Sequence, residues 1–327
     1  MEFYKQRVRL PEDEQSRLAT ARDTCSNAVV HGLDEKEELA PERFVEQGSF
    51  AMRTVVQHPE FEYDIDCGIL FSKEKIVGSR GGDKTPRDAR EMIAAAFDDK
   101  RFAKKPEVKK NCVRFHYQDG YHVDMPVYRR VTDFLGGKHH EIASGDEWKR
   151  SDPEAVTKWF NNGVQAKSPD MKVDGQMRRL TCLLKAVEKT REYYNWPSGF
   201  IVSVLVYDAY VSNTRDDVAF VNMVRRIVLR LKSSQRVPHP IISEYLAEDN
   251  NAKVRWMRDK LEEFDAKFAL LEKDCARGEA MKIWDQIFGV DFFTKRITEK
   301  AALLGFGSGA FTSPFTRPKD AGRWGDE

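Results

Sequence analysis

The chain has 327 residues, enough for two domains of ordinary size or for one large domain with a substantial core. Its 54 Lys and Arg nearly balance 53 Asp and Glu, and a formal net charge of +1 excludes a strong global attraction to nucleic acid or to an anionic membrane. No apolar run approaches the roughly 20 residues of a membrane helix, and the first residues lack the apolar centre of a signal peptide. We therefore expect a cytoplasmic protein with no membrane partner.

The cysteines do not form a recognisable metal or disulfide pattern. No CxxC is present, and no His lies at the spacing of a zinc finger. The five positions are Cys25, Cys67, Cys112, Cys182 and Cys275. We interpret them as reduced core thiols.

The first half of the chain mixes helix and strand patterns. Residues 13–31 have apolar residues at helical spacing, and Gly32 follows as a stop signal. Residues 61–71 are rich in aromatic and β-branched residues, which predicts a strand. Thr85 and Pro86 then predict the capped start of a second helix.

A hairpin is expected next. Residues 108–118 and 121–127 are strand-like runs joined by Asp119-Gly120, a pair typical of two-residue hairpin turns. Asp124 therefore lies on the second arm.

Beyond residue 150 helix patterns dominate. Expected helices begin at Pro153 and cover residues 175–194, 198–211, 215–232, 251–275 and 278–288. After Leu304 the sequence is rich in Gly, Ser, Thr and Pro without periodicity, which is typical of a flexible tail. We predict a mixed α/β core in residues 1–150, a helical lobe in residues 151–304 and a tail in residues 305–327.

Two acids stand one residue apart in the first predicted strand. Alternate side chains of a strand share a face, so Asp64 and Asp66 project together while Ile65 and Cys67 face the other way. Carboxylates this close repel each other unless a cation lies between them, and hard oxygen ligands suit Mg²⁺ or Mn²⁺. The alternative is a pair of solvated acids on an exposed edge strand.

The surroundings favour the metal site. Asp124, in a strand-like segment with apolar neighbours, is the natural third ligand, and three acids on neighbouring strands can hold two metals for in-line phosphoryl or nucleotidyl transfer. Gly48 allows close approach of the backbone to a phosphate, Ser49 can donate to a phosphate oxygen, and the following residues can open a helix.

Gly48-Ser49, the Asp64-x-Asp66 pair and the later strand residue Asp124 resemble the signature of the DNA polymerase β-like nucleotidyltransferase superfamily. Four segments of the second half resemble the helical lobe of bacterial CD-NTases, relatives of cyclic GMP-AMP synthase that make cyclic di- or trinucleotides in anti-phage (CBASS) operons. They are DPEAVTKWFNN, RRLTCLLKAVEK, WPSGFIVSVLVYDAY and IWDQIFGVDFF. The resemblance covers roughly residues 10–293.

This resemblance implies an α+β, bilobal fold with a mixed sheet and a helical C-terminal lobe. It implies that Asp64, Asp66 and Asp124 are the metal ligands of a two-metal Mg²⁺ or Mn²⁺ site. The nucleotide-binding residues that it implies, with Arg114 added from its place on the hairpin, are Gln47, Gly48, Ser49, Arg114, Lys185 and Ser203. For Lys185 the alternative is an exposed helix lysine.

The implied substrates are nucleoside triphosphates, and operon-encoded regulatory or effector proteins are the implied partners. The zinc insertion with which animal cyclic GMP-AMP synthase binds DNA has no counterpart in this sequence. Two other functions stay open: a transferase that makes linear oligonucleotides or acts on tRNA or a small molecule, and a catalytically silent nucleotide sensor.

Two further signals are rejected. In residues 78–85 Asp83 occupies the place of the second glycine of a Walker A loop, and its carboxylate would oppose a phosphate. His116 and His122 lie on the two hairpin arms, but we do not expect a zinc site there. A secondary role for His122 near the metals stays open.

Overall fold

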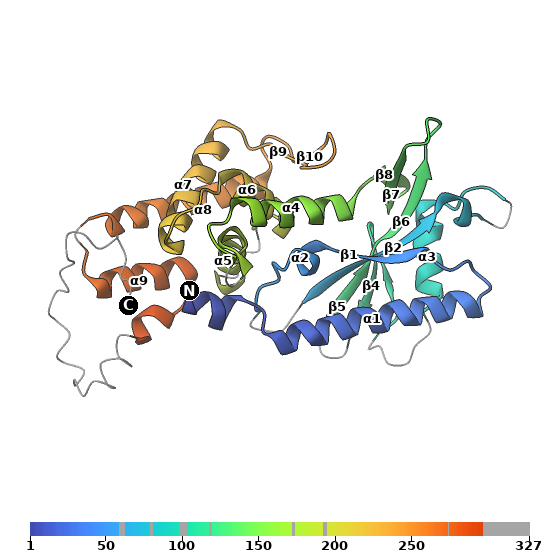
Figure 1. The fold of residues 1–327 in the computed structure, drawn as a ribbon, viewed down its shortest axis with the longest axis horizontal. Coiled ribbons are helices and arrows are strands. Elements are labelled where there is room, and N and C mark those ends of the chain that lie inside the picture. Colours follow the sequence, from blue (N-terminus) through green and yellow to red (C-terminus); the bar gives the residue numbers. More distant parts are fainter. Residues whose placement is uncertain are drawn as a thin grey trace. The chain divides into compact units, whose positions relative to one another are not determined.

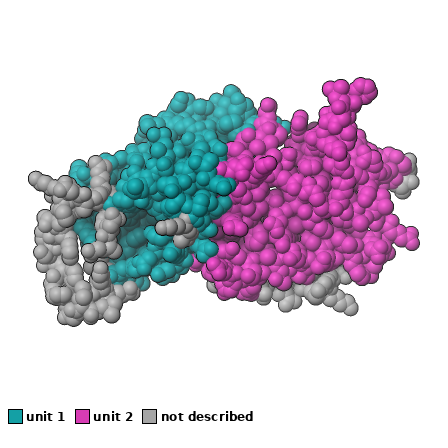
Figure 2. Space-filling model, viewed as in Figure 1, with its two compact units in different colours: residues 1–9, 163–239, 244–327 teal, residues 10–162, 240–243 magenta. Residues whose placement is uncertain are grey.

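The computed structural model describes residues 1–58, 63–78, 81–97, 104–117, 120–171, 174–191, 195–273 and 275–296. The chain divides into two compact units, which Figure 2 draws in different colours. The sheet unit comprises residues 10–162 and 240–243. The helical unit comprises residues 1–9, 163–239 and 244–327.

The division differs from the one expected after residue 150. The units divide after residue 162, inside helix α4 (Pro153–Lys167). Residues 1–9 belong to the helical unit, where the Tyr4 hydroxyl donates a hydrogen bond to Asp174 at 3.0 Å. The predicted tail, residues 305–327, lies outside the described residues.

An eight-stranded mixed sheet organises the sheet unit (Figure 1). Its strands are β1 (Arg43–Gln47), β2 (Asp64–Ser72), β3 (Glu107–Val108), β4 (Val113–His116), β5 (His122–Met125), β6 (Val127–Thr132), β7 (Lys138–Ser144) and β8 (Glu147–Arg150). The hairpin predicted from Asp119-Gly120 is confirmed by the antiparallel pairing of β4 and β5, although residues 118 and 119 lie outside the described residues.

Strand β2 lies inside the sheet rather than at its edge. It pairs antiparallel with β1 and parallel with both β5 and β6. The register is the same for both parallel partners, since Asp64 pairs with His122 and Ile69 with Val127. Pro126 separates β5 from β6, and because proline has no amide hydrogen it interrupts the ladder there. The alternative interpretation, in which Asp64 and Asp66 lie on an exposed edge strand, is therefore wrong.

Helices α1 (Glu12–Glu35) and α3 (Pro86–Ala95) supply the core that covers one face of this sheet. Their apolar side chains pack with inward residues of the strands, among them Leu18, Val29, Ile93, Ile65 and Val123. This face is fully apolar, so the polar residues that alternate with it along the strands must lie on the opposite face.

Gly32 does not end the first helix, contrary to the expectation. Helix α1 continues to Glu35, and a Cβ on Gly32 would lie 1.5 Å from the carbonyl oxygen of Ala96. The glycine therefore permits close packing of α1 against the end of α3.

The helical unit contains most of the second-half helices at the predicted places. They are α5 (Gln176–Arg191), α6 (Gly199–Ala209), α7 (Asp216–Ser233), α8 (Ala252–Leu271) and α9 (Arg277–Phe288). Aromatic side chains of α7, α8 and α9 pack together in the core of the helical unit, as the contact of Phe220 with Phe268 illustrates. The smaller elements of the whole chain are the π-helix η1 (Tyr4–Val8), the 3-10 helix η2 (Lys73–Lys75), α2 (Gly48–Ala51), β9 (Val237–Pro238) and β10 (Tyr245–Ala247). Within the described part of the chain, no helix combines the length and the apolar composition needed to cross a membrane.

Candidate active site

A single row of polar residues runs across five neighbouring strands. Gln47 of β1 pairs with Asp66 of β2, and Asp66 pairs with Asp124 of β5. Asp124 in turn pairs with Arg114 of β4, and Arg114 with Glu107 of β3. Four of these five residues carry a charge, and three were predicted as site residues together with Gln47. Sequence reasoning missed Glu107 because nothing local links it to the aspartates.

The aspartates lie on the face of the sheet opposite the α1–α3 core. Their strand neighbours Ile65 and Cys67 are buried in that core, so alternation turns Asp64 and Asp66 away from it. Asp64 is the more open acid, with a side chain 59% exposed, whereas the Asp124 side chain is 13% exposed. The three acids are thus adjacent on two neighbouring strands, as the sequence predicted.

The turn between β1 and α2 lies against Asp66. Gly48 has a φ of +67°, and a Cβ on it would lie 2.0 Å from Asp66 Oδ2. Ser49 follows in α2, which is a helix as expected. The amide oxygen of Gln47 is buried and has no hydrogen-bond partner among the described residues. The turn therefore brings the backbone of Gly48 to Asp66, while the unused acceptor of Gln47 lies close to Gly68.

Arg114 binds two of the three acids. Its Nε donates to Asp124 Oδ1 at 2.6 Å and its Nη2 to Asp124 Oδ2 at 2.7 Å. The same Nη2 lies 3.3 Å from Asp64 Oδ1. The hydrogen bonds to Asp124 raise the pKa of Arg114 above its ordinary value. A guanidinium is therefore the counter-ion of the acid cluster in this structure.

Two neighbours complete the surroundings of Asp124. Burial, followed by the charge of Asp124 and a hydrogen bond to it, raises the pKa of the Cys112 thiol to about 12. Cys112 is thus a neutral donor beside the acid, a role that its expected place in the core did not predict. His122 Nδ1 lies 3.5 Å from Asp64 Oδ1, and burial together with the Arg114 charge lowers the pKa of His122.

The donor set suits a divalent cation in its chemistry. Asp64, Asp66 and Asp124 offer hard carboxylate oxygens from adjacent strands, which are the ligands that Mg²⁺ and Mn²⁺ take in proteins. Within the residues that the structure describes, no three acid, His or Cys side chains are gathered around one point as metal ligands would be. Asp124 faces Arg114 instead, so holding a cation requires it to turn toward the other two acids.

The remaining predicted residues lie in the helical unit. The Lys185 side chain is buried, so the exposed helix lysine considered as its alternative is wrong. A Cβ on Gly199, the first residue of α6, would lie 3.3 Å from Lys185 Nζ. An ammonium at a helix N-terminus meets the positive end of the helix dipole, and an anion bound there would be stabilised by both.

Ser203 is fully buried, and its hydroxyl donates to the carbonyl of Gly199 at 2.8 Å. This bond lies within its own helix. A nucleotide contact would have to replace or share it, and the contact stays a prediction.

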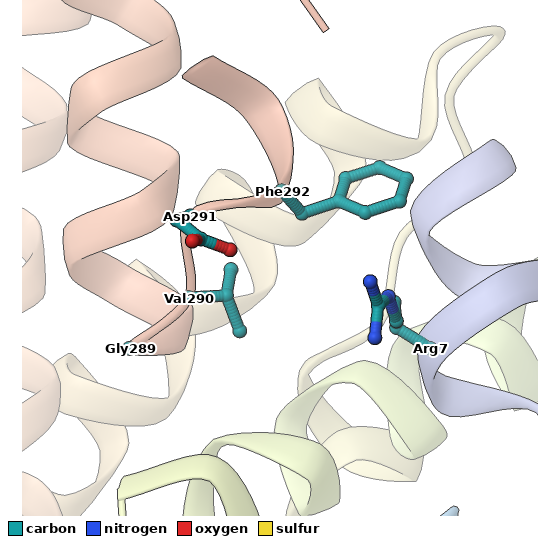
Figure 3. A pocket seen from close by; sticks show the side chains of 5 residues that line it. All are labelled: Arg7, Gly289, Val290, Asp291 and Phe292. Carbon is teal, nitrogen blue, oxygen red and sulfur yellow. The ribbon is translucent and has the colours of Figure 1, made fainter. Parts of the chain in front are cut away.

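A cavity of about 440 Å³ lies elsewhere in the helical unit (Figure 3). It is lined by Arg7, Gly289, Val290, Asp291 and Phe292. None of the predicted site residues lines it, and it offers a single carboxylate, so the candidate site remains the acidic row on the sheet.

The cysteine prediction is confirmed with one exception. The described cysteines are free thiols, and Cys25, Cys67, Cys112 and Cys182 are buried. Cys275 is only partly buried.

Comparison with known proteins matches part of the sheet unit to a family domain. Residues 42–128 match the model of the nucleotidyltransferase domain of cyclic GMP-AMP synthase DncV-like proteins. This range contains Gln47, Gly48, Ser49 and the three acids. The cyclic GMP-AMP synthase of Escherichia albertii is 26% identical over 204 residues, which are 61% of this chain and 44% of that protein. The aligned part thus spans less than half of that relative.

Solved structures share the fold over most of the chain. A D-loop deletion mutant of the Vibrio cholerae dinucleotide cyclase DncV matches with a TM-score of 0.68 and 17% identity, covering 86% of this chain and 92% of that one. Escherichia coli DncV bound to 3'-deoxy GTP matches with a TM-score of 0.65 and 18% identity over the same shares. V. cholerae DncV with the linear intermediate 5' pppA(3',5')pG matches with a TM-score of 0.66 and 16% identity, covering 86% and 91%.

The solved structures share the α+β fold predicted for this chain, and residues 42–128 match a nucleotidyltransferase domain. The match of residues 42–128 to this domain and the shared fold confirm the resemblance to the bacterial CD-NTases that the sequence indicated.

Proposed function

We propose that this chain joins nucleoside triphosphates, without a template, into a cyclic di- or trinucleotide. The observation that carries the proposal is the row in which Asp66 and Asp124 are register partners. Gly48 lies against Asp66, and Asp64 precedes Asp66 on the same face of β2. The location of this row within a DncV-like nucleotidyltransferase domain supports it.

In the proposed reaction an acceptor ribose hydroxyl attacks the α-phosphorus of a donor triphosphate. A new P–O bond forms, the bond to pyrophosphate breaks and the hydroxyl proton is released. The linear dinucleotide found with V. cholerae DncV supports a stepwise route, in which the linear product then closes on itself. Each bond releases one pyrophosphate, so two accompany a cyclic dinucleotide and three a cyclic trinucleotide.

The chain's own residues would divide the work between binding and orientation. Asp64, Asp66 and Asp124 would hold two divalent cations, Mg²⁺ or Mn²⁺. When bound, these lower the pKa of the attacking hydroxyl and stabilise the leaving pyrophosphate. Gly48 and Ser49 would contact the donor triphosphate through backbone and hydroxyl donors, and the Gln47 amide oxygen would accept from a water or a ligand beside Asp66.

The helical unit would supply further phosphate contacts. The buried Lys185 ammonium beside the first residue of α6 supports such a role, because an anion there gains from both the charge and the helix dipole. Arg114 and Ser203 stay as proposed nucleotide contacts. The proposed setting is a cytoplasmic anti-phage (CBASS) signalling pathway with operon-encoded regulatory or effector proteins.

The test is to incubate the purified chain with four labelled nucleoside triphosphates and Mg²⁺ or Mn²⁺, and to treat the products with phosphatase. A cyclic product has no terminal phosphate and survives. We expect a surviving species with wild type and with Asp23→Asn, a control that alters an exposed acid outside the row, and none with Asp64→Asn, Asp66→Asn or Asp124→Asn.

Other outcomes would contradict the proposal. Pyrophosphate release without a surviving species would indicate a linear transferase. Nucleotide binding without any pyrophosphate release would indicate a silent sensor, and near-wild-type turnover in an Asp→Asn variant would remove that acid from the site.

A further inference from the structure

The contact between Arg114 and Asp124 engages both carboxylate oxygens that a metal would bind on that acid. Both carboxylate oxygens receive an N–H from the guanidinium, at 2.6 and 2.7 Å. A fork of this kind fixes the carboxylate in orientation as well as in charge. A cation bound by Asp124 would therefore compete with the guanidinium for the same two oxygens and be repelled by its positive charge.

The same guanidinium also extends to the second acid. Its Nη2 lies 3.3 Å from Asp64 Oδ1, so the Arg114 guanidinium contacts one acid on β2 and one on β5. Asp64, Asp66 and Asp124 would otherwise repel one another. Arg114 thus supplies the positive charge that a divalent cation would supply at the same acids.

This ion pair is held by the sheet rather than by chance surface contact. Arg114 and Asp124 are register partners on β4 and β5. Their side chains are 21% and 13% exposed, so solvent and salt screen them weakly.

We propose that Arg114 is the resident counter-ion of the catalytic acids in the metal-free protein, and that a divalent cation binds only as Arg114 releases Asp124. This inference rests on the proposed function, because it takes Asp124 as a metal ligand. Arg114 is then a positioning residue that opposes metal loading until it is displaced.

The consequence is that removing Arg114 tightens metal binding. In the wild-type chain part of the binding free energy is spent on breaking the fork, whereas in Arg114→Ala there is no fork on Asp124 to break. Arg114→Lys keeps the positive charge but not the fork, because an ammonium is a point charge that cannot hold both oxygens in fixed geometry. Its affinity should lie between those of wild type and Arg114→Ala.

Lys109→Ala is the matched control. It removes one positive charge from the loop between β3 and β4, where Lys109 lies 3.5 Å from Glu107. Among the described residues Lys109 pairs with Glu107 and not with the three acids, so its loss reports the general effect of one charge at this edge of the sheet. Circular dichroism and thermal unfolding of each variant establish that it is folded before its affinity is compared.

The experiment measures binding of Mn²⁺ to the full chain without nucleotide, by the loss of the free-ion electron paramagnetic resonance signal. We expect Arg114→Ala to bind at least about tenfold more tightly than wild type, a factor that corresponds to about 1.4 kcal/mol. Lys109→Ala should remain within about twofold of wild type, and Asp124→Asn should weaken binding in the Arg114→Ala background.

Equal or weaker binding by Arg114→Ala, or the same gain in Lys109→Ala, would overturn the inference and leave the proposed function intact. Absence of Mn²⁺ binding in every variant would overturn both. If Arg114→Ala is unfolded, Arg114→Lys decides the matter, since affinity equal to wild type in that folded variant excludes the fork as an obstacle.

Discussion

Gly48→Ala tests whether the turn before α2 sets the position of Asp66. Gly48 has a φ of +67°, where a side chain is strained. The added Cβ would lie 2.0 Å from Oδ2 and 2.8 Å from Cγ of Asp66. Since the Asp66 side chain is the nearest obstacle, it must move.

The size of the effect follows from these distances. Ordinary contact begins at 3.4 Å, so the Asp66 oxygen must shift by about 1.4 Å from its 2.0 Å separation. A misplacement of about 1 Å at a reacting centre can lower a rate about 10²-fold. The left-handed backbone adds a cost of about 1–2 kcal/mol to folding. We therefore expect a fall in turnover of about 100-fold with a small loss of stability.

The assay compares pyrophosphate release and thermal unfolding of Gly48→Ala with those of Gly136→Ala. Gly136 has a φ of +81°, and nothing lies within 4 Å of its added Cβ. It therefore carries the backbone strain without the clash, far from the acids in the β6–β7 turn. We expect similar unfolding temperatures for the two variants and near-wild-type turnover only for Gly136→Ala. Gly48→Ala turnover within about twofold of wild type would refute the reasoning.

Three further predictions concern stability. Arg90 is 4% exposed, and its Nε and Nη1 have no hydrogen-bond partner among the described residues. Because burying such donors is costly, Arg90→Met should raise the free energy of unfolding by about 1–3 kcal/mol in denaturant titration. A decrease would contradict this. Asp216 accepts two hydrogen bonds from the buried Arg179, at 2.8 and 2.9 Å. Because Asp216→Ala leaves a buried charge without this partner, it should lower the free energy of unfolding by about 3–5 kcal/mol. A loss below about 1 kcal/mol would show that the pair is not structural. Burial raises the pKa of Glu188 above its ordinary 4.5, so the folded state retains this proton to higher pH than the unfolded state and loses stability as pH rises from 4.5 through the folded pKa. Glu188→Gln should therefore raise the unfolding temperature at pH 8 and have little effect at pH 4, and a difference independent of pH would contradict the assignment.

Local signals in the sequence predicted the features that depend on neighbouring residues. Alternation placed Asp64 and Asp66 on one face, and the Thr85 cap is present, with its hydroxyl accepting from the Asp88 amide at 3.1 Å. Helices with strong apolar periodicity, such as α7 and α9, begin and end within about two residues of their predicted bounds. Such features are decided within a few turns of chain, where the pattern and the structure share the same physical cause.

The strands that carry the aspartates were predicted, but the other strands of the sheet were predicted less well. β1, β6, β7 and β8 were missed because the segments that form them are rich in charge, and residues such as Arg43 and Glu147 do not alternate with apolar neighbours. They are strands because neighbouring strands supply partners for their backbone groups: β2 for β1 and β6, β6 for β7, and β7 for β8. Gly32 was misread for a similar reason, since the packing of Ala96 against it is invisible in the local sequence.

The sequence by itself determined which chemical groups are available for the proposed reaction: two acids on one strand face, a third acid on a hairpin arm and a Gly-Ser turn before them. The tertiary structure alone decided what those groups meet. The register of β2 against β5 makes Asp66 and Asp124 neighbours, and the register of β4 against β5 makes Arg114 the partner of Asp124. A shift of one residue in either pairing would turn these side chains to opposite faces. That register is set by the packing of the whole sheet on α1 and α3, which no single segment specifies.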